Sequence, residues 1–156
     1  MRLTVYTDYS LRVLMYLALR EEQLATIAEI AESYKISRNH LMKVAHQLGV
    51  AGFVETVRGR GGGLRLAKPI GAIGLGEVVR YTEPDMAIVS CFEPIGEPCA
   101  IQSCCVLKRA LKAARDAFLE VLDGYTLNDL IQPGGRLTGL LGISPVNGVT
   151  PAEPLP

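Results

Sequence analysis

All four cysteines of the chain lie within one stretch of fifteen residues, from Cys91 to Cys105. Between the first two, Pro94, Gly96 and Pro98 exclude a regular helix. A helical pattern begins directly after Cys105. Thiolate is the form of cysteine that binds metal, and a helix N-terminus favours negative charge. The fold therefore has to include a loop that is suited to holding a metal ion or a cluster.

The spacing of the cysteines leaves three interpretations open. Structural zinc sites usually pair their cysteines with about two to four residues in between, whereas seven residues separate Cys91 from Cys99 and no histidine lies near the loop. A disulfide between the adjacent Cys104 and Cys105 would be strained, and no signal peptide indicates an oxidising compartment. Iron–sulfur clusters tolerate wider spacing. The loop favours a cluster, with zinc or with redox-active or inert thiols as alternatives.

Composition points to a nucleic-acid partner for the N-terminal half. Residues 1–80 carry eleven Lys and Arg against seven Asp and Glu, and residues 81–156 carry five against nine, although the net charge is zero. A basic half suits phosphate contacts, but an ordinary solvated surface would carry the same charge. No apolar run reaches the roughly 18 residues of a membrane span, and no targeting segment is visible. We expect a soluble, cytoplasmic protein.

The first fifty residues predict three helices. Thr7 is the expected N-cap of a helix over residues 8–20, and Thr26 opens a capping box for a second helix. Ser37 is expected to begin a third helix, which Gly49 would end. Two short helices joined by a tight turn are typical of a helix-turn-helix, with an ordinary helical hairpin as the alternative.

The third predicted helix has the composition of a recognition helix. Its apolar residues recur at helical spacing, and its other face carries polar and basic side chains that can read a DNA groove. Lys35 occupies the preceding turn, where a glycine would fit more easily. The residues of this helix expected to contact DNA are Ser37, Arg38, Asn39, His40 and Lys43.

A glycine-rich hairpin follows the third helix. Residues 53–58 alternate as a strand does, residues 64–67 form a second, shorter strand, and Gly-Arg-Gly-Gly-Gly lies between them. A hairpin in this place predicts the wing of a winged helix. A glycine-rich phosphate cradle is the alternative, but the sequence matches neither a dinucleotide-binding motif nor a P-loop. The arginines expected to contact DNA from the wing are Arg58, Arg60 and Arg65.

The C-terminal half predicts a long amphipathic helix over residues 106–123 whose apolar stripe needs a partner surface. We expect this helix to form a homodimer rather than to pack on its own small domain. The fold class is then mainly α with a small β-hairpin wing. The expected organisation is a winged helix-turn-helix over 1–82, a cysteine-rich loop over 83–105, a dimerisation helix and short following helix over 106–131, and a flexible tail over 132–156.

Four segments together resemble a known family, the dimeric winged-helix iron–sulfur regulators of bacteria. They are the opening MRLTVYTDYSLR, the helix ISRNHLMKV, the wing VRGRGGGLRLAKP, and the cysteine loop running into LKRAL. The resemblance covers about residues 1–131 and is strongest, at Thr7–Tyr9 and Ser37–His40, to the NsrR-like nitric-oxide-sensing repressors, whose relatives include IscR. It implies a homodimeric repressor that binds an inverted-repeat operator in double-stranded DNA and senses nitric oxide through a cluster, [4Fe–4S] in preference to [2Fe–2S].

The resemblance also implies a ligand set. NsrR-like proteins use three cysteines and an aspartate at the start of the first helix, donated by the other subunit, and the matching residues are Cys91, Cys99, Cys105 and Asp8. The family's last cysteine directly precedes the L-K-x-A-L run, which selects Cys105.

Two features depart from the family's pattern. The gap of seven residues after Cys91 is longer than usual, and Cys104 is an additional thiol. IscR-like members carry a histidine ligand three residues after the last cysteine, where this chain has Lys108. For Asp8, the alternative is an ordinary acid that is stabilised by the helix dipole.

No catalytic triad or acid–base pair is recognisable, so we expect no enzymatic activity. Two other kinds of protein could carry such a cysteine loop. One is an electron carrier that uses the same cluster, and the other is a regulator that senses redox state through thiols or zinc. Within the resembled family, the alternative to nitric-oxide sensing is a regulator that senses redox or iron–sulfur status.

Overall fold

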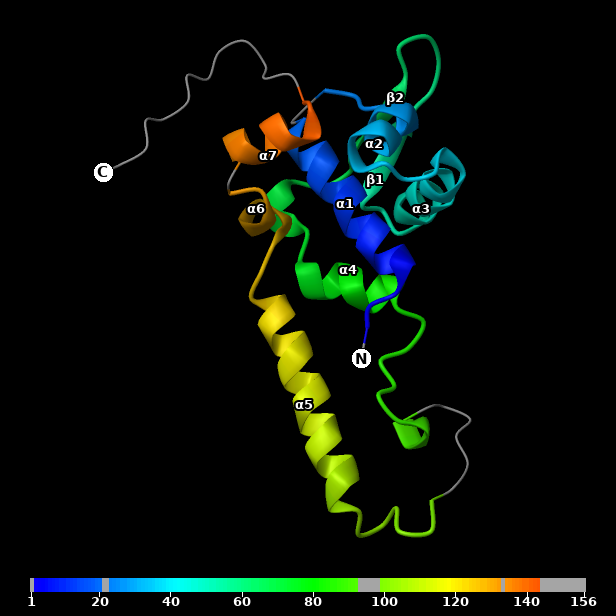
Figure 1. Ribbon diagram of the computed structural model, residues 1–156, viewed down its shortest axis with the longest axis vertical. Coiled ribbons are helices and arrows are strands. Elements are labelled where there is room, and N and C mark those ends of the chain that lie inside the picture. The colour runs from blue at the N-terminus through cyan, green and yellow to red at the C-terminus, as the bar shows by residue number, and fades with distance from the viewer. Residues whose placement is uncertain (1, 21–22, 93–98, 133, 144–156) are drawn as a thin grey trace, which may run out of the picture.

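The computed structural model of the protein describes residues 2–20, 23–92, 99–132 and 134–143. Helices dominate the fold, and the two strands pair as an antiparallel hairpin, which confirms the expected class (Figure 1). The elements are α1 (Val5–Leu19), α2 (Ile27–Tyr34), α3 (Arg38–Val50), β1 (Val54–Val57), β2 (Gly63–Leu66), η1 (Ile70–Ala72), α4 (Leu75–Thr82), η2 (Ser90–Phe92), α5 (Val106–Asp123), α6 (Leu127–Leu130) and α7 (Gly134–Leu141).

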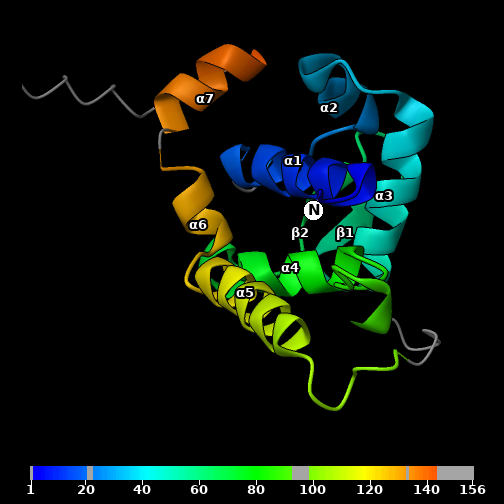
Figure 2. The ribbon, with the colours of Figure 1, turned by 60° about the horizontal axis from the view of Figure 1, so that its bottom comes forward.

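Helix α1 runs through the middle of the molecule, with α2 and α3 on one side, α6 and α7 on the other, and α4 beneath it in the view of Figure 2. It begins earlier than the sequence predicts, and Thr7 is not its N-cap. Thr4 has that role, because its hydroxyl accepts a hydrogen bond from the Thr7 amide at 3.2 Å. Thr7 instead lies fully buried in the first turn. Asp8 therefore belongs to the end of that turn rather than to its first position.

The helix-turn-helix forms as predicted, with a strained turn. The capping box of Thr26 and Glu29 is present at the start of α2. Lys35 ends α2 in the left-handed conformation, at a φ of 55°. Ser37 precedes α3 as expected, although its side chain makes no capping hydrogen bond.

Helix α3 passes through Gly49, which was predicted to end it, and continues to Val50. The left-handed residue that follows the helix is Gly52, at a φ of 74°. The Phe53 amide then donates to the carbonyl of Leu48 at 3.0 Å, which closes the turn. Gly52 is therefore the glycine that allows the chain to turn after the helix. Gly49, three residues earlier, lies within the helix and gave the misleading signal.

The wing is a short hairpin in which Val54 pairs with Leu66 and Val57 with Gly63. Its loop contains Gly59 and Gly61 at positive φ. A side chain at Gly62 would collide with the backbone of the first strand and of the loop. The glycines are thus required by the backbone of the loop.

The long helix α5 extends away from the helical body (Figure 1), and none of its residues is buried. Its C-terminal end packs against α4, where Asp123 lies so close to Gly76 that a side chain there would overlap it. Arg80 of α4 donates to both carboxylate oxygens of Asp123, at 2.5 and 2.6 Å. These hydrogen bonds hold the pKa of Asp123 below its usual value. The root of α5 is therefore fixed to the winged-helix body.

The segment after residue 132 differs from the flexible tail that its Pro and Gly content predicted. Residues 134–141 form α7, and the Leu141 carbonyl accepts a hydrogen bond from the Ser33 hydroxyl of α2 at 2.8 Å. Ile143 is buried at 5% exposure, and Leu127 of α6 at 2%, in the same core as α1. Part of the predicted tail therefore completes the core of the predicted domain over residues 1–82, because its apolar side chains have a surface to cover. Residues 144–156 lie outside the described part.

Candidate nucleic-acid interface and cysteine segment

The first turns of α3 present their polar side chains to solvent. The apolar side of the helix is buried through Leu41, Val44 and Leu48. This burial directs the opposite face outward, so the residues predicted to contact DNA from this helix are exposed: Ser37, Arg38, Asn39, His40 and Lys43.

Among the described helices, none is both long and apolar enough to cross a membrane.

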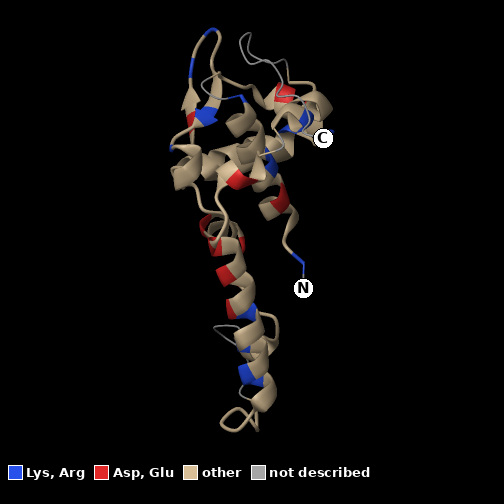
Figure 3. Ribbon diagram, turned by 90° about the vertical axis from the view of Figure 1, so that its left-hand side faces the viewer, with Lys and Arg blue, Asp and Glu red and all other residues tan. Residues whose placement is uncertain are grey.

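The wing places two of its three predicted DNA contacts at its tip. Arg58 and Arg60 are exposed at the loop, and Figure 3 shows basic residues on the loop at the top of the molecule. Arg65 instead lies within β2, directly opposite Glu55 of β1, and pairs with its carboxylate. Arg65 thus forms a cross-strand ion pair with Glu55, because the strand register places the two residues opposite each other. The carboxylate of Glu55 partly neutralises the charge of Arg65.

The four cysteines occupy two kinds of position, and all four thiols are free. Cys91, in η2, and Cys105 are partly buried, whereas Cys99 and Cys104 are exposed. Cys105 is the N-cap of α5, and its sulfur accepts a hydrogen bond from the Lys108 amide at 3.3 Å.

The chemistry of these side chains fits an iron–sulfur cluster, but their arrangement is not that of an assembled site. Free thiols, one of them held at a helix N-terminus, are the donors that such clusters take. Within residues 2–20, 23–92, 99–132 and 134–143, however, no three His, Cys, Asp or Glu side chains are gathered so as to hold a metal ion. The predicted ligands Cys91, Cys99, Cys105 and Asp8 are therefore not brought together by the fold of a single chain.

Asp8 is engaged within its own helix. Its two carboxylate oxygens accept from the Nε and a terminal nitrogen of Arg12, each at 3.0 Å. The Arg12 guanidinium lies over the ring of Tyr34 at 5.6 Å from the ring centre. Burial raises the pKa of Tyr34 to about 12, so that its phenol stays neutral beneath the cation. To bind a metal, the Asp8 carboxylate would have to give up its ion pair with Arg12.

The first helix also touches the recognition helix. The ring of Tyr9, next to Asp8, lies 6.4 Å from the ring of His40 on α3, centre to centre. On the far end of α3, the Tyr81 hydroxyl of α4 donates to the carbonyl of Gln47 at 3.1 Å. The position of α3 is thus linked to both α1 and α4.

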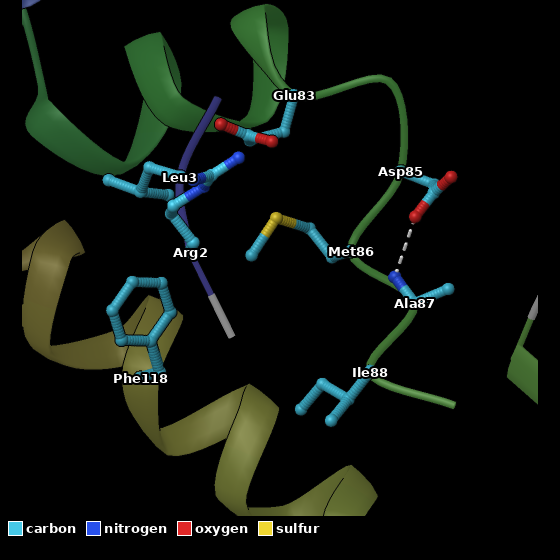
Figure 4. A pocket seen from close by; sticks show the side chains of 8 residues that line it. All are labelled: Arg2, Leu3, Glu83, Asp85, Met86, Ala87, Ile88 and Phe118. Atoms are coloured by element: carbon cyan, nitrogen blue, oxygen red, sulfur yellow. Dashed lines mark hydrogen bonds between the residues drawn. The ribbon is translucent and has the colours of Figure 1, made fainter. Parts of the chain in front are cut away.

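Glu83, a charged residue that precedes the cysteine segment, has a role that the sequence patterns did not predict. Glu83 follows α4, and one of its carboxylate oxygens accepts hydrogen bonds from the Thr4 amide, the Thr4 hydroxyl and the Thr7 hydroxyl. It lies at the edge of a pocket of about 290 Å³ (Figure 4). The contact joins residues nearly eighty positions apart, and no local pattern in the sequence indicates it. The pocket is lined by Arg2, Leu3, Glu83, Asp85, Met86, Ala87, Ile88 and Phe118.

Comparisons with known proteins agree with this arrangement. The HTH-type transcriptional regulator NsrR of Bacillus subtilis is 55% identical over 133 residues, which cover 85% of this chain and 91% of that protein. NsrR of Bacillus licheniformis is 50% identical over 142 residues, 90% of this chain and 99% of that protein. Among solved structures, CymR, the global cysteine regulator of B. subtilis, superposes with a TM-score of 0.67 at 30% identity, covering 83% of this chain and 95% of that chain.

The family model for Rrf2, described as an iron-dependent transcriptional regulator, matches residues 3–133. The two NsrR relatives carry the name of a transcriptional regulator, in agreement with the expectation of no enzymatic activity. The match spans the winged helix, the cysteine segment and α5. The chain belongs to the Rrf2 family of transcriptional regulators.

Proposed function

We propose that this regulator is a homodimeric repressor that binds an operator in double-stranded DNA and senses nitric oxide through an iron–sulfur cluster. The observation that carries the proposal is the presence, on one chain, of an outward-facing recognition helix with a basic wing and of a segment with four free thiols. The relatives named NsrR support the assignment to this branch of the family.

The DNA-binding surface consists of the start of α3 and the tip of the wing. The α3 side chains, led by Arg38 and Asn39, would read base edges in the major groove, and Arg60 at the wing tip would enter the adjacent minor groove. Arg58 and Lys43 would contact phosphates, which makes the affinity dependent on salt. Because Arg65 is already paired with Glu55, its contribution should be smaller.

A second copy of the chain would cover the apolar face of α5. Leu107 and Val121 are 65% and 62% exposed in the single chain. Two winged-helix domains joined in this way would present their recognition helices to successive major grooves, about 34–36 Å apart along the DNA. An inverted-repeat operator follows from the two-fold symmetry of such a dimer.

Cys91, Cys99 and Cys105 would hold the cluster, with Asp8 of the partner subunit as the fourth ligand. The cluster, when bound, supplies iron that reacts with nitric oxide, and an oxygen ligand among thiolates is the weak position. Ligation would draw Asp8 away from Arg12 and tie the first turn of α1 to the cysteine segment of the other subunit. Since Tyr9 lies beside His40, a shift of this turn reaches α3, and loss of the tie would release it.

Anaerobic purification followed by a DNA titration tests the proposal. We expect a brown protein with iron and sulfide in equal amounts, and tight binding of this form to an inverted repeat. Binding should weaken steeply between low and moderate salt, because several phosphates are contacted. A colourless protein that binds the operator equally well would instead support sensing through thiols. A brown protein without affinity for any DNA would support an electron carrier.

A further inference from the structure

The start of α1 is attached to the end of α4 through one carboxylate. Oε1 of Glu83 accepts from the Thr4 amide at 2.8 Å, from the Thr4 hydroxyl at 3.2 Å, and from the hydroxyl of Thr7. Thr7 is fully buried, so that its hydrogen bond is shielded from water. Figure 4 shows Glu83 above Leu3 and Arg2, where the N-terminal segment passes beneath α4. We call this group of three residues the Glu83 clamp.

The clamp satisfies groups that a helix start otherwise leaves without partners. The first amides of a helix have no acceptor within the helix, and the positive end of the helix dipole favours an anion there. Hydrogen bonds to a charged acceptor are stronger than those between neutral groups. Removal of the carboxylate would take away the charged acceptor of the buried Thr7 hydroxyl and leave it only the Thr4 hydroxyl, 3.1 Å away, as a partner. The clamp therefore holds the first turn of α1 in one position on α4.

The clamp connects two parts of the chain that the proposed function requires to act together. Glu83 is the first residue after α4, where the segment that leads to Cys91 begins. Thr7 directly precedes Asp8. The carboxylate of Asp8 points to Arg12, and no hydrogen bond joins it to Glu83 among the described residues. Any effect of Glu83 on Asp8 is thus transmitted through the backbone of the first turn.

We propose that Glu83 is a positioning residue that fixes the first turn of α1, and with it Asp8, where Asp8 can complete the cluster of the partner subunit. The inference rests on the proposed function. A cap that merely stabilises the fold would make the same three hydrogen bonds. The two roles differ in what happens to the cluster when the clamp is removed and the fold survives.

The first measurement uses the apo-protein and needs no cluster. The Asp8 amide donates to the Thr4 carbonyl at 3.1 Å, so its hydrogen exchange reports whether the first turn stays closed. In Glu83→Ala and in Thr7→Val, which removes one hydroxyl at nearly constant volume, this amide should exchange at least roughly tenfold faster than in the wild type. Glu77→Gln is the matched control, since Glu77 lies on the same helix and pairs with Lys68 at the surface. Equal exchange in all four proteins would overturn the clamp.

The second measurement uses the holo-dimer. The visible and circular-dichroism spectra of Glu83→Ala should shift from the wild type in the same direction as those of Asp8→Asn. In the double variant the change should be no larger than in Asp8→Asn alone, because both substitutions act on one ligand. A purely structural role would lower the melting temperature, leave the spectrum of the single variant unchanged, and overturn the inference.

The outcomes separate this inference from the proposed function. A wild-type protein that takes up no cluster overturns the proposed function and the role of Glu83 toward it. If the wild type binds a cluster and the spectrum of Glu83→Ala equals that of the wild type, only the role of Glu83 is overturned. If Glu83→Ala does not fold, Thr7→Val decides in its place, because its spectrum is expected to shift in the same way.

Discussion

Lys35 is the one non-glycine residue with a positive φ in the part of the chain that the structure describes. The left-handed conformation brings its Cβ close to its own carbonyl oxygen, a conflict that glycine avoids. Lys35→Gly should therefore stabilise the protein by about 0.5–1 kcal/mol, after allowance for the greater freedom of glycine in the unfolded chain. Urea denaturation of the apo-protein measures this. Lys35→Ala is the control, because alanine keeps the conflict, and an equal gain in that variant would contradict the explanation.

The neighbouring thiols Cys104 and Cys105 differ in their surroundings, which gives a second prediction at the level of single residues. Cys105 caps α5, whereas Cys104 is exposed, with its sulfur 3.6 Å from the carbonyl of Ile101. Cys105→Ser should lose the cluster but keep the helix, because a serine hydroxyl is a good N-cap and can accept the Lys108 amide. Cys104→Ser should keep the cluster. Iron content and helicity of both variants test this, and the reverse result would exchange their roles.

At the level of elements, the wing tip is predicted to contribute more to DNA binding than the wing strands. Arg60 is exposed at the loop and forms no ion pair with another described residue, while Arg65 is paired with Glu55. Arg60→Ala should weaken operator binding by about 1–3 kcal/mol, the scale of a good groove contact. Arg65→Ala should cost less. Fluorescence anisotropy with a labelled operator measures both, and Arg136→Ala on α7 is a control that leaves this surface unchanged. Equal affinity for Arg60→Ala and wild type would remove Arg60 from the interface.

Local signals in the sequence were sufficient for elements whose ends are defined by their own residues. The capping box at Thr26 and the apolar stripe of α5 predicted those helices correctly. The start of α1 was misplaced because Thr4 and Thr7 offer the same signal, and the cap that forms is at Thr4, whose hydroxyl accepts from the Thr7 amide. Helix α7 was missed for a related reason. Its apolar residues are too few to predict a helix until the surface of α1 and α2 is known.

The candidate site was predictable in the same uneven way. The recognition helix and wing follow from patterns of a few residues, and the structure exposes them. The pairing of Arg65 with Glu55 depends on strand register, whereas that of Asp8 with Arg12 follows from their spacing of four residues on α1. The described residues do not bring the predicted cysteine ligands together, so a cluster site built from them stays a prediction. Contacts of this kind are set by tertiary and quaternary structure rather than by local sequence.

For the whole molecule, α5 is predicted to join two copies of the chain. Its apolar face is exposed in the single chain, and burial of this face in a dimer would be favourable by roughly 25 cal/mol for each Å² removed from water. Leu107→Asp places a charge in that face and should yield monomers in sedimentation experiments. Arg109→Glu, on another side of the same helix, should remain dimeric. Dimers of Leu107→Asp with wild-type stability would place the interface elsewhere.

In the proposed mechanism, one dimer couples the state of a cluster to the binding of an operator. A titration of nitric oxide into the anaerobic holo-protein on its labelled operator tests this directly, with visible absorption and anisotropy recorded on the same sample. We expect the visible absorption of the cluster to fall and the anisotropy to fall with it, over the same range of added nitric oxide. Loss of the visible absorption with the anisotropy unchanged would contradict the account.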